Sequence, residues 1–221
     1  MNDRGMKPLI VSLTHNQNFS NLQNALVMKI IFLSHPEVNI DPMVAVPLWS
    51  LSNLGRVRMR AFCSGGALAN VNAIHTSMER KATDCGEIAR EILGVPWFQN
   101  ALLGEIDRSA TGYLPPDEHS EVGREMFEKP HESIRGWETA ADAQHRIFLG
   151  FSEVTTQARD QAGDLLVVSH GGVGLLLLCK LLGEPISRRH VMKNRGGGCF
   201  FTIDRRTMRV LTLWDDMDAH R

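Results

Sequence analysis

Two histidines, His35 and His170, each stand at the end of a short apolar segment. The segments, residues 29–33 and 165–168, lack polar alternation, which is typical of strands buried on both faces of a parallel sheet. Ligands of open α/β sheets bind at the carboxyl ends of such strands. If the two strands are parallel neighbours, the two imidazoles lie side by side at a binding edge. The alternative for either residue is a hydrogen-bonded structural histidine.

Two further features indicate an anionic ligand. The glycines after His170 lead into an apolar helix predicted over residues 173–182, and a helix N-terminus attracts anions. Arg80 falls in the first turn of a second predicted helix, residues 81–92, where a cation is unfavourable unless an anion is bound.

The start of this second helix also allows a purely structural interpretation. Ser77 is of the residue type that caps helices. Arg80 is then a surface residue paired with Glu79 or Asp84, and such pairs contribute little to stability. The sequence leaves both interpretations of Arg80 open.

Glu105 is the candidate proton donor. It lies in residues 104–113, which have no helical or strand periodicity, and such loops in compact domains are more often functional than structural. Because Glu105 follows Leu102 and Leu103, we expect its carboxyl group to be partly desolvated, as those of general acids commonly are.

The remaining patterns supply a scaffold. Residues 69–74 are predicted to form a strand, and residues 135–139, RGWET, are predicted to open the longest helix. Two closing strands, residues 199–203 and 209–214, are expected to form a hairpin at the edge of the sheet.

Length and composition place these elements in an ordinary water-soluble protein. The chain has 221 residues, of which 43% are hydrophobic and 22% charged, and its net charge is −1. No global field therefore favours nucleic acid or a membrane surface as a partner. We expect a single domain over residues 28–221, preceded by a flexible extension over residues 1–27.

Cysteine usage and hydropathy indicate a cytoplasmic location. The four cysteines include no C-x-x-C pair, so we expect reduced thiols and no metal site. The longest apolar stretch, residues 173–182, is too short to cross a bilayer, and the first residues lack the apolar run of a signal peptide.

The order of these residues resembles the histidine phosphatase superfamily, the phosphoglycerate-mutase-like proteins. Residues 167–172, VVSHGG, look like its second histidine motif, and residues 32–37, FLSHPE, look like the first. Residues 76–82, TSMERKA, are similar to the turn that ends in a phosphate-binding arginine, and residues 103–107, LGEID, to the segment with the proton donor. The helix start at residues 136–139, GWET, also fits.

The resemblance implies a three-layer α/β/α sandwich with a mostly parallel central sheet. It also implies that His35 attacks a phosphomonoester and carries a phosphohistidine, which splits one displacement into two. Arg80 and His170 would hold the equatorial oxygens. Glu105, or else Asp107, would protonate the leaving alcohol and then activate water, with no metal or other cofactor required.

One departure from the family pattern concerns the residue before the nucleophile. The family has an arginine there and this chain has Ser34, which cannot offer a charged fork to a phosphoryl group. Losing such a contact typically costs on the order of 10² to 10³ in rate. Arg108, Arg135 and Arg195 are the candidates for a compensating cation.

Two functions therefore stay open. The first is a phosphatase, with reduced activity, for a small phosphorylated metabolite or a phosphoprotein. The second is a catalytically weakened protein that binds phosphate or a partner, and a phosphomutase is a further option. We expect residues 108–131 to form a lid that determines substrate specificity. A homodimer is one option for the oligomeric state.

Overall fold

The computed structural model describes residues 27–192 and 196–220. The expected N-terminal extension therefore lies almost entirely outside the described residues, as does Arg195. None of the helices in the described ranges is long and apolar enough to cross a membrane. The four cysteines are all buried.

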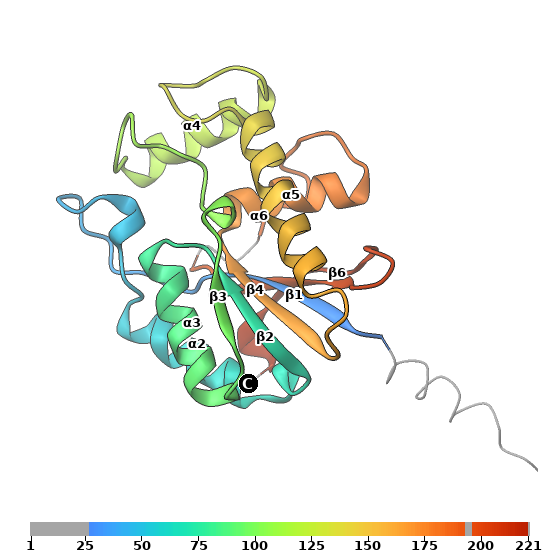
Figure 1. The fold of residues 1–221 in the computed structure, drawn as a ribbon. Helices are drawn as coiled ribbons and strands as arrows, with labels where there is room; N and C mark the ends of the chain where they lie inside the picture. Colours follow the sequence, from blue (N-terminus) through green and yellow to red (C-terminus); the bar gives the residue numbers. More distant parts are fainter. Residues whose placement is uncertain (1–26, 193–195, 221) are drawn as a thin grey trace, which may run out of the picture.

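The centre of the molecule is a six-stranded sheet with the order β3-β2-β4-β1-β5-β6 (Figure 1). Strands β3, β2, β4 and β1 are mutually parallel, and β5 and β6 are antiparallel to the strands beside them. The strands are β1 Lys29–Ser34, β2 Val71–Thr76, β3 Trp97–Gln99, β4 Asp164–Ser169, β5 Cys199–Asp204 and β6 Val210–Asp216. The mostly parallel sheet and the hairpin at its edge confirm the predictions from sequence.

Helices cover both faces of the sheet, which gives the expected three layers (Figure 1). Helices α2 and α3 pack together on one face, and α5 and α6 pack together on the other. Helix α4 lies beyond the strand ends, above this second layer. The helices are α2 Asn53–Ser64, α3 Arg80–Leu93, α4 Pro116–Glu128, α5 Ala140–Gln157 and α6 Gly171–Leu182.

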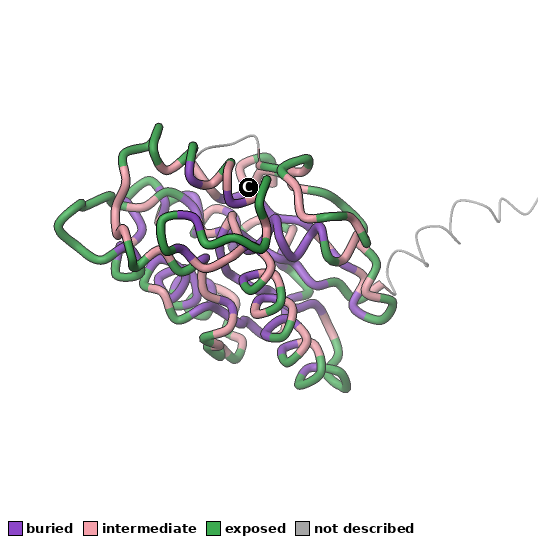
Figure 2. The backbone as a smooth tube through the Cα atoms, turned by 90° about the horizontal axis from the view of Figure 1, so that it is seen from above, coloured by how far each residue is buried: buried purple, intermediate pink, exposed green. Residues whose placement is uncertain are grey.

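The central strands are apolar throughout because each of their faces meets a helical layer. In β1, Ile30 and Phe32 belong to the core under α5 and α6, whereas Ile31 and Leu33 belong to the core under α2 and α3. All six residues of β4 are buried. Figure 2 shows the buried segments gathered in the interior, with exposed segments around them. Alternate strand residues thus serve two cores, which explains the absence of polar alternation.

Three elements differ from the patterns seen in the sequence. Strand β2 begins two residues later than expected and extends through His75 and Thr76, which are buried despite their polar side chains. Strand β3 is only three residues long and lies at the sheet edge, so its pattern was too short to recognise. Helix α4 lies inside the expected lid and starts after Pro115 with Pro116 and two acidic residues, which are ordinary signals of a helix start.

Candidate active site

The two histidines lie together at the carboxyl edge of the sheet. Strands β1 and β4 are parallel neighbours in which Ser34 is paired with Ser169. The next residue of each strand, His35 and His170, therefore leaves the sheet at the same level. Their ring centroids are 5.2 Å apart, with the planes at 69°. The structure thus places the two imidazoles side by side, as the pattern of the strands predicted.

His35 is oriented by its own loop. Its Nδ1 lies 2.8 Å from the carbonyl oxygen of Pro36, and this acceptor favours the tautomer that carries its proton on Nδ1. The lone pair is then on Nε2, which is the nitrogen a nucleophile needs. Burial lowers the pKa of His35 to about 4, aided by the charges of Lys81 and Arg108. His35 is therefore neutral at pH 7.

His170 is fully buried and is held from one side only. A hydrogen bond of 2.7 Å joins its Nε2 to the hydroxyl of Ser77, and a carboxylate oxygen of Glu79 lies 3.5 Å from the same nitrogen. Within the described residues, its Nδ1 is buried without a hydrogen-bond partner. Burial holds the pKa of His170 well below its usual value, although Glu79 opposes the shift. A buried ring nitrogen without a partner is a site where a ligand can bind.

Ser77 has a different role from the helix cap that its residue type suggested. The N-cap position of α3 is Glu79, and no side chain caps it. The Ser77 hydroxyl instead bonds His170 and accepts from the Glu79 backbone N–H at 3.3 Å. The propensity of serine for helix starts was therefore outweighed by a tertiary contact from β4.

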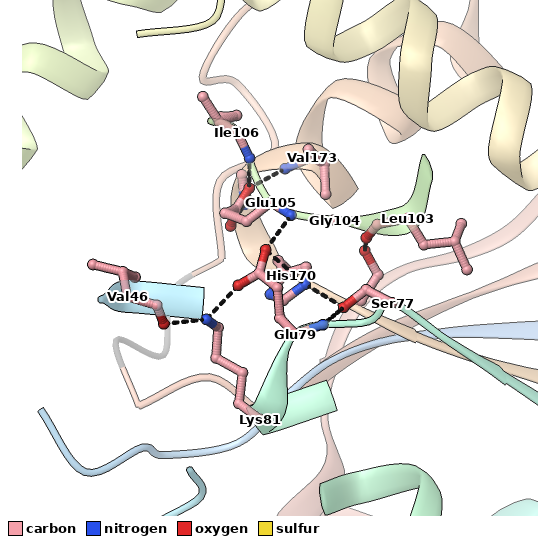
Figure 3. Close-up of polar contacts among 12 residues, drawn as sticks. Val46, Ser77, Glu79, Lys81, Leu103, Gly104, Glu105, Ile106, His170 and Val173 are labelled. Carbon is pink, nitrogen blue, oxygen red and sulfur yellow. Dashed lines mark hydrogen bonds and ion pairs between the residues drawn. The ribbon is translucent and has the colours of Figure 1, made fainter. Parts of the chain in front are cut away.

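A buried ion pair lies beside the histidines, formed by Glu79 and Lys81 (Figure 3). The Lys81 ammonium also donates to the carbonyl of Val46 at 2.9 Å. The Glu79 carboxylate also accepts the backbone N–H of Glu105 at 2.7 Å. Burial would raise the pKa of Glu79, but the adjacent His170 imidazole, the Lys81 ammonium and the hydrogen bonds from Lys81 and from the Glu105 N–H hold it at about 2. The carboxylate is therefore ionised.

Glu105 lies with its carboxylate at the N-terminus of α6. It accepts the N–H groups of Gly172 and Val173, each at 3.0 Å, as well as that of Ile106. A Cβ on Gly172 would lie 2.7 Å from this carboxylate, so the close approach requires glycine. Gly172 is two positions after His170 in the sequence, so the Glu105 carboxylate lies close to the histidines.

Asp107, the alternative proton donor, lies at the protein surface. It is exposed, and its carboxylate accepts the Ser109 N–H at 2.8 Å, which lowers the pKa of Asp107. The geometry therefore favours Glu105 over Asp107. Arg146 fixes the Glu105 segment, because its guanidinium donates to the carbonyls of Gly104 and Glu105 and pairs with Glu138.

The structure does not bring Arg80 to the histidines. Its guanidinium pairs with Asp84 at 2.9 Å and its side chain is 49% exposed, which matches the structural interpretation left open by the sequence. The next residue, Lys81, is the cation beside the site, with a side chain only 4% exposed. Because one step along a helix start turns a side chain by about 100°, Lys81 is directed to the buried side of the helix start and Arg80 to the exposed side.

The residue before the nucleophile, Ser34, is almost fully buried. Its hydroxyl lies 3.6 Å from where a Cβ of Gly171 would stand, so it faces the first residue of α6. Ser34 is therefore close to the helix N-terminus but brings no charge to it.

Of the three arginines considered as compensating cations, the described residues include Arg108 and Arg135. The charge of Arg108 acts on both His35 and His170. Arg135 pairs instead with Glu118 at 2.9 Å, and both side chains are about half exposed. In the part of the chain that the structure describes, no group of three or more His, Cys, Asp and Glu side chains is arranged to hold a metal ion.

A family model matches most of the chain. The model of the histidine phosphatase superfamily (branch 1) matches residues 47–216, a range that includes Glu105 and His170 and begins after His35. Among curated proteins, no sequence matches the chain significantly.

Solved structures with the same fold include several phosphatases. A mycobacterial glucosyl-3-phosphoglycerate phosphatase in complex with inorganic phosphate is 20% identical, with a TM-score of 0.70 over 86% of this chain and 98% of its own. The YhfR protein of Bacillus stearothermophilus is 18% identical, with a TM-score of 0.69 over 85% of this chain and 96% of its own. The alpha-ribazole phosphatase of Shigella flexneri is 17% identical, with a TM-score of 0.61 over 84% and 94%. At these identities the likeness establishes the fold.

Proposed function

Because the chain belongs to the histidine phosphatase superfamily, we propose that it is a metal-independent phosphomonoester hydrolase that works through a phosphohistidine on His35. The single observation that supports this most strongly is the state of His35. The imidazole is neutral at pH 7, its Nδ1 faces a carbonyl oxygen, and a second buried imidazole lies 5.2 Å away.

In the first step of the proposed reaction, the Nε2 lone pair of His35 attacks the phosphorus atom. The bond from phosphorus to the ester oxygen breaks, and the leaving oxygen takes a proton from the carboxylic acid form of Glu105. In the second step, the Glu105 carboxylate removes a proton from water as the water oxygen attacks phosphorus. The phosphorus–nitrogen bond then breaks, which releases inorganic phosphate and neutral His35.

The donors available for the phosphoryl oxygens are unlike those expected from the sequence. We assign them to His170 through its unpartnered Nδ1, to the Lys81 ammonium and to Arg108. A lysine is a point charge without the bidentate fork of an arginine, and Ser34 adds no charge. We therefore propose a slow enzyme, with a rate lower by on the order of 10² to 10³ than that of a site with the full set of charged donors.

The substrate that we propose is a small phosphorylated metabolite or a phosphoprotein. The related structures are named for glucosyl-3-phosphoglycerate and for alpha-ribazole phosphate chemistry, and both names describe phosphomonoester hydrolysis. The segment from Arg108 to His131, which contains α4, would contact the part of the substrate beyond the phosphate and so would determine which ester is accepted.

The test is hydrolysis of p-nitrophenyl phosphate by wild type, His35→Ala and Glu105→Gln between pH 4 and pH 8. We expect turnover to vanish in His35→Ala and to fall by at least 10²-fold in Glu105→Gln. Equal rates for wild type and His35→Ala would remove the proposal.

A second candidate function is a phosphate-binding or partner-binding protein with weakened catalysis. The observation that favours it is the Ser34 position together with a carboxylate, Glu79, beside His170. Ser34→Arg separates the two functions. A large gain in turnover would indicate that the natural protein is impaired, whereas an active wild type with no gain would indicate that Lys81 and Arg108 already supply the charge.

A further inference from the structure

The Glu79 carboxylate stands among groups that suit a phosphoryl anion (Figure 3). One of its oxygens accepts the Glu105 N–H at 2.7 Å and lies 3.5 Å from the Nε2 of His170. The other pairs with the Lys81 ammonium. The side chain is only 14% exposed, and so this anion is held inside the site.

The charges around the site are nearly balanced before any substrate binds. Lys81 is neutralised by the ionised carboxylate of Glu79. A doubly charged phosphate ester would meet this carboxylate, and like charges separated by a few ångströms repel strongly in a buried site. The Lys81 ammonium, whose side chain is buried, is thus already paired with an anion.

We infer that Glu79 is an internal competitor of the substrate, which holds the Lys81 ammonium until a phosphoryl group displaces it and thereby sets the affinity of the site for phosphate. This inference rests on the proposed function, because it takes the site to be one for phosphate. Binding requires Lys81 to exchange one anionic partner for another. A phosphoryl group that carries a single negative charge is therefore favoured over one that carries two.

A purely structural role for Glu79 makes the opposite prediction. If the carboxylate only held Lys81 and the Glu105 segment in place, then removing its charge would loosen the site and weaken phosphate binding. If it competes with the substrate, then removing its charge strengthens binding. The direction in which phosphate affinity changes when the charge of Glu79 is removed therefore distinguishes the two roles.

The experiment is isothermal titration of inorganic phosphate into wild type and Glu79→Gln at pH 7. The glutamine keeps the size of the side chain and an oxygen that can accept the Glu105 N–H. We expect phosphate to bind at least tenfold more tightly to Glu79→Gln. The matched control is Glu91→Gln, which removes the same charge from an exposed pair with Arg60 and should leave the affinity unchanged.

A second pair of variants tests whether Lys81 carries the effect. In Glu79→Gln/Lys81→Gln the tenfold gain should disappear, and Glu79→Leu, which fills the same volume with an apolar side chain, should reproduce it. Unchanged or weaker phosphate binding in a folded Glu79→Gln, or a gain that persists without Lys81, would overturn the inference. So would a failure of both Glu79→Gln and Glu79→Leu to fold, because Glu79 would then be a structural residue.

These outcomes are separate from the test of the proposed function. Titration measures phosphate binding without turnover. Tighter phosphate binding by Glu79→Gln would therefore support the inference even if His35→Ala showed no loss of rate and the proposed function failed. Conversely, a catalytic His35 with no change in affinity on removing Glu79 supports the proposed function and overturns only this inference.

Discussion

Gly172→Ala should damage catalysis through a single methyl group. Its Cβ would lie 2.7 Å from a carboxylate oxygen of Glu105 and 2.8 Å from the Cδ1 of Ile106. An ordinary contact at such a Cβ is 3.4 Å or more, so the carboxylate must withdraw by about 0.7 Å. The change therefore displaces the proposed proton donor without altering its chemistry.

The magnitude follows from the hydrogen bonds that are lost. The carboxylate accepts the N–H groups of Gly172 and Val173, each at 3.0 Å, and a hydrogen bond to a charged group contributes about 1.5–3 kcal/mol. Losing one of them from the arrangement needed in the transition state lowers kcat/KM by roughly 10- to 100-fold. Stability should change less, because alanine is favoured over glycine in a helix by about 1 kcal/mol.

The assay is p-nitrophenyl phosphate hydrolysis together with urea unfolding of the same preparations. Gly66→Ala is the control, because a Cβ there also meets nothing within 4 Å and the residue lies outside the segment 108–131. This variant should leave the rate unchanged. If folded Gly172→Ala turns over within twofold of wild type, then Glu105 does not need its place at the N-terminus of α6, and the reasoning is refuted.

Three further predictions concern the histidines. Because the pKa of His35 is lowered to about 4, the acid limb of kcat/KM should lie near pH 4; a limb near 6.5 in a pH–rate profile would contradict the assigned nucleophile. Ser77→Ala leaves the Nε2 of His170 buried without its 2.7 Å partner, which should cost about 1–3 kcal/mol in urea unfolding; no loss would mean that the bond is not needed. Burial lowers the pKa of His75 to about 4 in the folded protein, below the unfolded value of about 6.5. The stability that the neutral, buried imidazole contributes is therefore fully present above pH 6.5 and is lost as the pH falls toward 4. Phenylalanine at position 75 can still stack on Phe98 but cannot take up a proton. Between pH 7 and pH 4.5, the free energy of unfolding should therefore fall by about 2 kcal/mol less in His75→Phe than in wild type. Equal falls in urea unfolding of the two proteins would show that His75 does not contribute to the acid-induced loss of stability.

The pairing of His35 with His170 could be predicted because it depends on the sheet. Two buried parallel strands leave a strong apolar pattern in the sequence, and their register fixes where the following residues emerge. The position of Glu105 was also accessible, since it follows an apolar pair and lies in a segment without periodicity. The positions of His35, His170 and Glu105 could therefore be predicted because they depend on the course of the backbone.

The cation could not be placed in the same way. Arg80 and Lys81 are adjacent, and which one points into the site depends on where α3 begins, to within one residue. Lys81 is buried because Glu79 and the carbonyl of Val46 come from different turns of the chain to meet it. Glu79 is only two residues away, but the contact with Val46 is distant in sequence and leaves no local pattern, so both members of the ion pair were missed as site residues.

The most direct measurement of the central claim is mass spectrometry of the protein quenched during turnover of p-nitrophenyl phosphate. The account predicts one added phosphoryl group, located on His35, that is absent from His35→Ala and decays when water is allowed to react. A phosphoryl group on any other residue, or sustained hydrolysis by His35→Ala, would contradict the account.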